Sequence, residues 1–253
     1  MFMLQRNNNL EGGNSMDNRY LSNERAISKT TTEASTLFLA KVFNWMAIRL
    51  GLTGLAAFLT VNSQAALQFV FGNKLVFYGL ILGELGLVFY LSLRVERISA
   101  QAATAMFVIY SALNGVTLSA VLLLYTMTSI AATFFITAGM FAAMAIYGFV
   151  TKRDLASWGS FLFMGLIGII IAAVVNMFLA SSMLSWIISA IGVLVFTGLT
   201  AYDVQKITRI GEQGIMEGGE AVIRKGAIMG ALALYLDFIN LFLMLLRFLG
   251  DRR

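Results

Sequence analysis

Long apolar runs dominate the chain from about residue 40 onward. An apolar stretch of about 20 residues can cross the hydrocarbon core of a bilayer as a helix. Seven such stretches occur, separated by polar or charged connections: residues 40–62, 74–94, 101–125, 129–150, 159–180, 184–205 and 226–249. They do not alternate over segments of about ten residues, as the strands of a membrane β-barrel do. The pattern predicts an all-α integral membrane protein with seven transmembrane helices.

The first 36 residues have a different pattern, rich in Asn, Ser, Thr and Glu and without a long apolar run. A secretory signal peptide needs an apolar segment close to its start, so this stretch does not resemble one. We interpret residues 1–36 as a disordered polar tail outside the bilayer. Residues 37–253 then form a single transmembrane domain.

Basic residues mark one side of the predicted bundle. They gather in the tail and after the second, fourth and sixth helices, whereas the other connections carry almost none. Because cytoplasmic connections are enriched in Lys and Arg, the N-terminus is predicted to be cytoplasmic. Arg247, Arg252 and Arg253 disagree, since a seventh full span places them outside. We favour seven spans over the alternative, a last helix that re-enters and leaves six.

Composition supports the membrane class and narrows the chemistry. Hydrophobic residues make up 59% and charged residues 12% of the chain, against about 45–50% and about 25% in soluble domains. Cys, His and Pro are absent, which excludes disulfides, thiolate metal sites and the commonest general base. The net charge of +5 is assigned to membrane topology rather than to nucleic-acid binding. No bound cofactor is expected.

Two acids interrupt the last two apolar helices. Asp237 lies near the middle of its helix, where an acid costs roughly 2.5–3.5 kcal/mol on insertion scales, and Asp203 lies toward the cytoplasmic end of the preceding helix. Consecutive helices usually pack antiparallel, so a tilt or an unwound turn could bring the acids together. The pair would share a proton, or would offer hard oxygen ligands for transient Ca²⁺ binding. Alternatively each acid pairs with a separate base, such as Lys206 for Asp203.

Other polar residues inside the predicted helices have weaker assignments. Glu84 lies in the middle of the second helix, either on an ion route or as a protonated acid hydrogen-bonded inside the bundle. Asn240 is the local polar neighbour of Asp237, and Arg49 is assigned a structural role. Asn114 and Asn176 lie beside stripes of small residues, which favour tight helix packing over a polar pathway.

Three sequence segments resemble those of a known protein family. VFTGLTAYDVQKI and GALALYLDFINLFLMLLRFLG, around Asp203 and Asp237, are similar to the hallmark of the Bax inhibitor-1 family. GMFAAMAIYGFVTKRDLASWG is similar to its bacterial, YbhL- and YccA-like branch. The resemblance covers nearly all the chain from about residue 40 to the C-terminus. It implies a multi-pass protein of the bacterial inner membrane.

The resemblance also implies a mechanism and an arrangement. Six helices are expected around a central C-terminal helix, and a pH-sensitive calcium leak is expected to be gated by the pair Asp203 and Asp237. The expected partners of the protein are then Ca²⁺, protons and the surrounding lipid bilayer. Glu84 falls where relatives often have an acid in the second helix. A latch arginine is expected at the end of that helix, where Arg94 and Arg97 straddle the matching place, and we select Arg94.

Three other functions are alternatives to a calcium leak. Intramembrane aspartyl proteases also use a Tyr-Asp pair like Tyr202–Asp203, but their second aspartate sits in Gly-x-Gly-Asp and a Pro-Ala-Leu follows. Here the second site is ALYLD and Pro is absent, so the chain is not expected to be an enzyme. The alternatives kept are a proton-coupled cation exchanger and a non-transporting regulator of another membrane protein, such as a membrane protease. An exchanger differs from a leak in moving protons against Ca²⁺ with fixed stoichiometry.

Overall fold

The computed structural model describes the backbone of residues 4–253 and the side chains of residues 30–253. All regular elements in this part of the chain are helical. They are α1 (Leu4–Val61), α2 (Gln64–Phe71), α3 (Lys74–Arg94), α4 (Ala100–Leu124), α5 (Met127–Val150), α6 (Ala156–Leu179), α7 (Ser182–Glu212), the 3₁₀ helix η1 (Ile215–Glu217) and α8 (Gly219–Leu249).

Seven of these helices are long and apolar enough to cross a membrane, which confirms the predicted class. They are all the α-helices except α2, and the span in α1 is Thr30–Val61. The predicted tail, residues 1–36, falls mostly on residues whose side chains lie outside the described part, so its disorder stays a prediction. Only its last residues are described in full, and they belong to α1, where Ser35 is buried.

Polar residues define where the helices begin. Side-chain oxygens at the N-terminal caps of five helices accept a hydrogen bond from a backbone N–H of the first turn, and these caps are Ser63, Asn73, Ser99, Thr126 and Ser181. Such a cap satisfies one of the unpaired donors at a helix start. The polar residues between the apolar runs therefore mark the helix boundaries. Proline, which often ends a helix, is absent from this chain.

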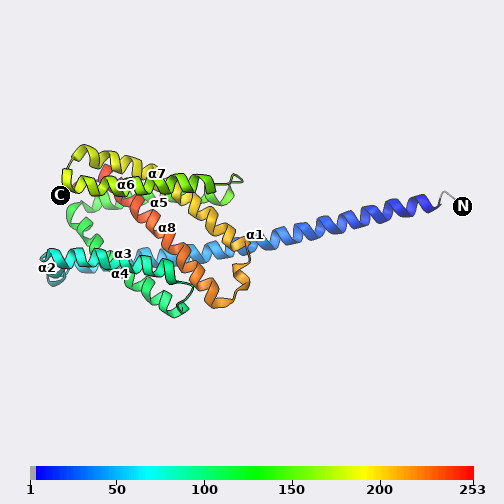
Figure 1. The fold of residues 1–253 in the computed structure, drawn as a ribbon, viewed down its shortest axis with the longest axis horizontal. Helices are drawn as coiled ribbons and strands as arrows, with labels where there is room; N and C mark the ends of the chain where they lie inside the picture. The colour runs from blue at the N-terminus through cyan, green and yellow to red at the C-terminus, as the bar shows by residue number, and fades with distance from the viewer. Residues whose placement is uncertain (1–3) are drawn as a thin grey trace.

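Helix α8 is the most buried of the described spans. It packs against α1, α4, α5 and α7, whereas α3 packs mainly on α4 and α6 mainly on α7. In Figure 1, α8 crosses the bundle diagonally between the helices of its two sides. The expected arrangement of six helices around a central C-terminal helix is therefore not confirmed, because α3 and α6 pack mainly on helices other than α8.

The end of α8 decides between seven spans and a re-entrant last helix. The C-terminus lies at the opposite end of the bundle from the N-terminal extension of α1 (Figure 1). There Thr126 N donates to Asp251 O at 3.1 Å and Arg253 N donates to Leu124 O at 3.0 Å, which fastens the C-terminus to the α4–α5 connection. An unbroken α8 that ends beside this connection is a full span.

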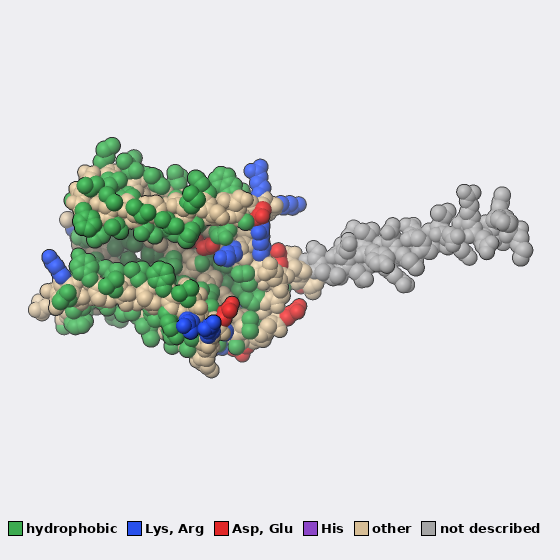
Figure 2. Space-filling view, in the orientation of Figure 1, with side chains coloured by type: hydrophobic (Ala, Val, Ile, Leu, Met, Phe, Trp, Pro, Cys, Tyr) green, Lys and Arg blue, Asp and Glu red, His purple; other side chains and the backbone are tan. Residues whose placement is uncertain are grey.

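The surface has the charge distribution of a membrane protein. Figure 2 shows hydrophobic side chains along the sides of the bundle, with most charged side chains gathered near the end where α1 leaves it. We name this end the basic end; it carries the connections α3–α4, α5–α6 and α7–α8. The opposite end, with the C-terminus, is named the outer end. These names describe the molecule, and its orientation in a membrane stays a prediction.

Glycines allow the closest helix contacts. A Cβ atom on Gly148 of α5 would lie 2.3 Å from the carbonyl oxygen of Ala201 in α7, and one on Gly115 of α4 would lie 2.4 Å from that of Thr53 in α1. Backbone atoms cannot move aside as the end of a flexible side chain can. Helices α5 and α7, and α4 and α1, would therefore have to separate to admit even a methyl group.

We expect Gly148→Ala to destabilise the protein by about 1–3 kcal/mol, the usual effect of an added group in a packed core. The measurement is thermal unfolding of the purified protein in detergent. Gly83→Ala in α3 is the matched control, since nothing lies within 4 Å of the Cβ it would add. Equal stability of the two variants would contradict the close α5–α7 contact.

Candidate functional site: an acid pair at the end of a cavity

The structure brings together the two predicted acids. The side chains of Asp203 in α7 and Asp237 in α8 lie close enough to interact directly. Asp237 is 5% exposed, whereas Asp203 is partly buried. Two carboxyl groups this close favour one shared proton, because two like charges at short range repel each other.

Small residues on α8 let α7 approach the acid pair. Gly226, Gly230, Ala233 and Asp237 follow one another at intervals of four, three and four positions, which places them on one helix face. A Cβ on Gly230 would lie 3.3 Å from Ile207 of α7, and 3.0 Å from Val42 of α1. The face that presents Asp237 thus also lies in close contact with α7 and α1.

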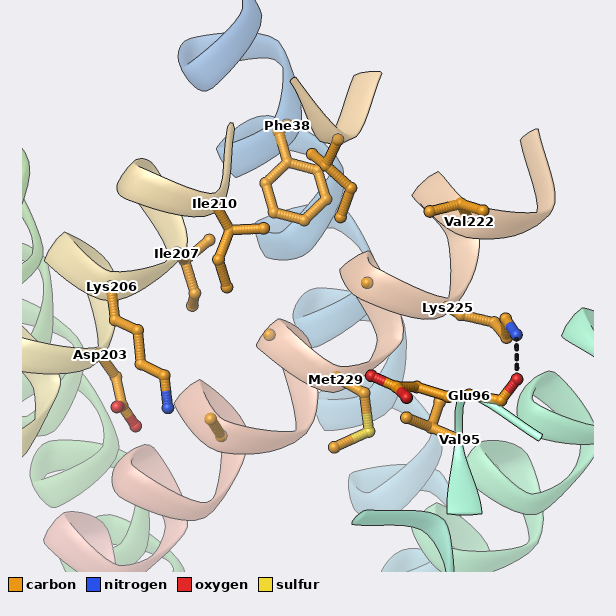
Figure 3. Close-up of a pocket in the computed structure, with 14 residues that line it drawn as sticks. Phe38, Val95, Glu96, Asp203, Lys206, Ile207, Ile210, Val222, Lys225 and Met229 are labelled. Carbon is orange, nitrogen blue, oxygen red and sulfur yellow. Dashed lines mark hydrogen bonds between the residues drawn. The ribbon is translucent and has the colours of Figure 1, made fainter. Parts of the chain in front are cut away.

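A cavity of about 580 Å³ leads from the basic end to Asp203. Helices α1, α7 and α8 and the α3–α4 connection line it, through Phe38, Val95, Glu96, Asp203, Lys206, Ile207, Ile210, Ile215, Val222, Lys225, Gly226, Met229, Gly230 and Ala233. Figure 3 shows Asp203 and Lys206 projecting from α7 into the same space, with Glu96 and Lys225 across it. The cavity is therefore charged on both sides while much of its wall is apolar.

Two lysines line the cavity, whereas the predicted latch, Arg94, does not. Lys206 interacts electrostatically with Asp203, although among the described residues only Arg209–Asp154 and Arg224–Glu220 form ion pairs. Lys225 Nζ donates to Glu96 O at 3.0 Å, which ties α8 to the α3–α4 connection. Arg94 is exposed at the end of α3 and does not line the cavity. The latch role of Arg94 therefore stays a prediction.

The other predicted site residues make their hydrogen bonds to groups other than the acid pair. Asn240 Nδ2 donates to Leu236 O of its own helix at 2.8 Å. Glu84 is buried and accepts hydrogen bonds from Asn114 Nδ2 and Thr117 Oγ1, each at 3.0 Å. The structure thus gives Glu84 the hydrogen-bonded interior position that was one of its two interpretations.

A second polar cluster lies on the other side of α8. The hydroxyl of Tyr235 donates to Asn114 Oδ1 at 2.7 Å and lies 2.9 Å from Thr53 Oγ1, so hydrogen bonds connect it to Glu84 through Asn114. Tyr235 and Asp237 are two positions apart, about 200° around a helix of 3.6 residues per turn. Helix α8 therefore carries the acid pair on one face and the cluster with Glu84 on the opposite one.

Arg49 belongs to this second cluster, and the sequence did not reveal its surroundings. Its side chain is 0% exposed. The guanidinium carbon lies 4.1 Å from the ring centroids of Tyr110 and Tyr235 and 4.7 Å from that of Phe107. All three guanidinium nitrogens lack a hydrogen-bond partner within the described structure. Arg49 is thus a buried cation stabilised by aromatic faces rather than by an acid.

The acid pair offers limited coordination for a cation. In the part of the chain with described side chains, no three acidic residues gather into a metal site. One oxygen of the pair, Asp237 Oδ2, is buried without a hydrogen-bond partner there. Ca²⁺ takes six to eight oxygen ligands, so these two carboxylates alone suit a passing hydrated ion better than a permanent one.

The α5–α6 connection is fastened to α7 close to Asp203. Gln205 Oε1 accepts from Leu155 N at 2.9 Å and Gln205 Nε2 donates to Arg153 O at 2.8 Å. Arg209 Nη2 donates to Asp154 Oδ1 at 2.7 Å. The Ala156 N–H and the Arg209 guanidinium hold the pKa of Asp154 below its usual value. These contacts fix the turn of α7 that carries Asp203.

These features define a polytopic α-helical membrane protein with an intramembrane carboxyl pair at the inner end of a charged cavity. The chain belongs to the Bax inhibitor-1 family, because the family model described as "Inhibitor of apoptosis-promoting Bax1" matches residues 35–253. That match covers all seven spans except the first turns of α1.

Several bacterial proteins are similar over most of this chain. "Inner membrane protein YbhL" of Escherichia coli is 50% identical over 216 residues, which is 85% of this chain and 92% of YbhL. An uncharacterized protein of Borreliella burgdorferi is 49% identical over 85% of this chain and 92% of its own. "Uncharacterized protein RP147" of Rickettsia prowazekii is 46% identical over 89% and 94%. None of these names states an activity.

The aromatic cage predicts an asymmetric response to mutation. Tyr110→Leu removes one of the aromatic rings that stabilise the buried charge of Arg49. We expect the free energy of unfolding to fall by about 2 kcal/mol or more. Arg49→Met keeps most of the volume but removes the buried charge, so stability should be unchanged or higher. Thermal unfolding in detergent measures both. If Arg49→Met destabilises as strongly as Tyr110→Leu, the guanidinium makes a net contribution that this account omits.

The Asp154–Arg209 pair predicts a pH effect at the basic end. Because the folded-state pKa of Asp154 is lowered, its stabilising effect is present at neutral pH and is lost as the pH falls through that pKa. Asp154→Asn should lower the melting temperature slightly at pH 7 and make the decrease between about pH 5 and pH 3 shallower. Glu217→Gln is the control, since Glu217 forms no ion pair in the described residues. If the melting temperatures of the parent and of Asp154→Asn differ by the same amount at every pH, the Asp154–Arg209 pair does not cause the pH effect.

Proposed function

We propose that the protein is a pH-sensitive calcium leak channel, with Asp203 and Asp237 as its gating pair. The observation that carries the proposal is the contact between these two acids at the end of a cavity that reaches the basic end. A cation entering this cavity meets the carboxyl oxygens of Asp203, with Asp237 behind them, and carboxyl oxygen is the ligand type that Ca²⁺ prefers.

In this proposal the described conformation is closed to ions, because an apolar cluster lies on the outer side of the acid pair. On the outer side, α7 and α8 pack through an apolar cluster that includes Val195, Leu199, Leu241 and Leu245. A hydrated cation cannot cross such a layer without widening it. The shared proton stabilises close contact of α7 and α8, since its loss would place two like charges together. The state of the pair is therefore coupled to the spacing of the helices that close the route.

Proton sensing does not need histidine in this mechanism. An exposed aspartate titrates near about 3.9, too low to respond near neutral pH. A buried pair titrates as one unit, and its two steps differ because the first charge opposes the second. We propose that the pair responds between about pH 5 and pH 8, with Lys206 favouring its ionised form.

We place the protein in the bacterial inner membrane with the basic end and the N-terminus in the cytoplasm. Support comes from the similar protein YbhL, which is named an inner membrane protein, and from the basic residues in the connections at that end. The cavity then opens to the cytoplasm. A membrane-protein partner, as the regulator alternative requires, stays a prediction without an identified surface.

An exchanger is the second candidate, and one observation favours it. Glu84 is a second buried acid, connected through Asn114 to Tyr235 on α8 by hydrogen bonds. Buried acids joined by hydroxyl and amide groups are the components of a proton relay. An exchanger would move a fixed number of protons against each Ca²⁺, whereas a leak would not.

The test is Ca²⁺ flux into proteoliposomes that contain only this protein, measured between pH 5 and pH 8. Asp203→Asn and Asp237→Asn should each abolish or displace the pH transition. The double variant should depart from additivity by more than about 0.5 kcal/mol, as contacting residues do. Glu217→Gln, an acid outside the cavity lining, should behave as the parent.

A flat flux in the parent protein across this range, or an unchanged midpoint in both single variants, would refute the assignment of the pair. Proton movement recorded with an internal pH dye distinguishes the two transport candidates. A fixed proton-to-Ca²⁺ ratio that persists against a Ca²⁺ gradient would replace the leak by the exchanger.

A further inference from the structure

A second cavity, of about 840 Å³, lies at the outer end between the end of α6, the start of α7 and the end of α8. It lies at the other end of α7 and α8 from the cavity beside Asp203, and the two cavities share no lining residue. Its polar part includes Asn176, Ser181, Ser185, Arg247 and Arg252, and apolar side chains of α6 and α7 line the remainder. We name it the outer cavity.

The charge in the outer cavity is positive and is not neutralised by its own lining. Arg247 and Arg252 both line it, and no acidic residue does so. Neither guanidinium makes a hydrogen bond or an ion pair within the described residues; Arg252 only approaches the ring of Tyr125, at 5.9 Å. The carboxylate of the nearby acid Asp251 lies beside Ser129 of α5, whose Oγ donates to Asp251 Oδ2 at 3.5 Å. Two positive charges therefore face the cavity without an anionic partner.

The level of the cavity corresponds to the boundary of a membrane. Arg247 is in the last turn of α8, and Trp186 is near the start of α7, where its ring stacks on Phe248 at 4.7 Å between centroids. Trp rings are enriched at the headgroup level of bilayers. Below this level, the lining residues Val174 and Met177 of α6 are exposed on the surface that faces lipid. The cavity thus runs from the headgroup level into the hydrocarbon region.

The same arginines were the exception in the charge pattern of the sequence. They lie on the end of the bundle whose connections carry almost no Lys or Arg. An anionic ligand bound between them would offset this charge. Asn176 can contribute as well, because its Nδ2 uses one hydrogen on Ser185 Oγ, at 2.8 Å, and has a second one available.

We propose that the outer cavity binds the phosphate headgroup of an anionic phospholipid, with Arg247 and Arg252 as its charged ligands. Arginine is well suited to this, since its planar fork donates two parallel hydrogen bonds to phosphate oxygens. The apolar part of the cavity, continuous with the lipid-facing surface of α6, accommodates the start of an acyl chain. A soluble anion would leave that apolar part unused, which is why the lipid is preferred over free phosphate.

The experiment compares thermal stability of the purified full-length protein in nanodiscs of phosphatidylcholine alone and with added phosphatidylglycerol. Phosphatidylglycerol should raise the melting temperature, and titration should show its affinity falling about fivefold for each arginine replaced, in Arg247→Gln and Arg252→Gln. Lys74→Gln is the matched control, because Lys74 starts α3 at the same end but does not line the cavity. It should retain the full effect of phosphatidylglycerol.

Three outcomes would overturn the proposal. Equal stabilisation by both lipids would show that negative charge is not recognised, and an equal loss in Lys74→Gln would show only a diffuse surface effect. Stabilisation of the same size by inorganic phosphate in phosphatidylcholine nanodiscs would assign the site to a soluble anion. Should Arg247→Gln fail to fold, Arg252→Gln alone decides, since Arg252 lies beyond the end of α8.

Discussion

The contact between Asp203 and Asp237 constrains how α7 and α8 can pack. A buried carboxylate without a partner is unfavourable by several kcal/mol, and two ionised carboxylates in contact are worse. A proton shared between the two acids reduces this cost, and sharing it requires helix backbones that approach closely. Gly226, Gly230 and Ala233, on the same face of α8 as Asp237, permit that approach. The small residues and the acid therefore act as one structural unit.

Helix α8 must satisfy polar groups on both of its faces, which accounts for its burial. One face carries Asp237, and the other carries Tyr235, which contacts Thr53 and Asn114 and covers Arg49. Lipid cannot satisfy hydroxyl or carboxyl groups, so each face needs a protein neighbour that can. Helices α7, α1 and α4 supply these neighbours, whereas α3 and α6 can remain at the periphery because their own surfaces are mostly apolar.

Sequence alone predicted what depends on local length and on chain order. The seven spans follow from apolar runs that are each long enough to cross a bilayer, and the meeting of Asp203 with Asp237 follows from two consecutive antiparallel helices. It did not predict the cage around Arg49, the fastening of the α5–α6 connection by Gln205, or the distance of Arg94 from the pair. These depend on which helix faces meet. In a membrane helix the lipid-facing and core-facing sides are both apolar, so periodicity does not identify the buried face as it does in water.

The two cavities place different chemistry on the same pair of helices. The acid pair joins α7 to α8 toward the basic end, and the outer cavity contacts α7 through Trp186 and α8 through Arg247 toward the other end. The apolar cluster with Leu241 and Leu245 separates them. A ligand that binds one spacing of α7 and α8 better than another shifts the equilibrium between the two spacings, and the coupling is reciprocal. An anionic lipid that holds the outer ends of α7 and α8 together would therefore favour the protonated, closely packed acid pair. By the same factor, a change in the proton bound by the pair would alter the affinity for the lipid.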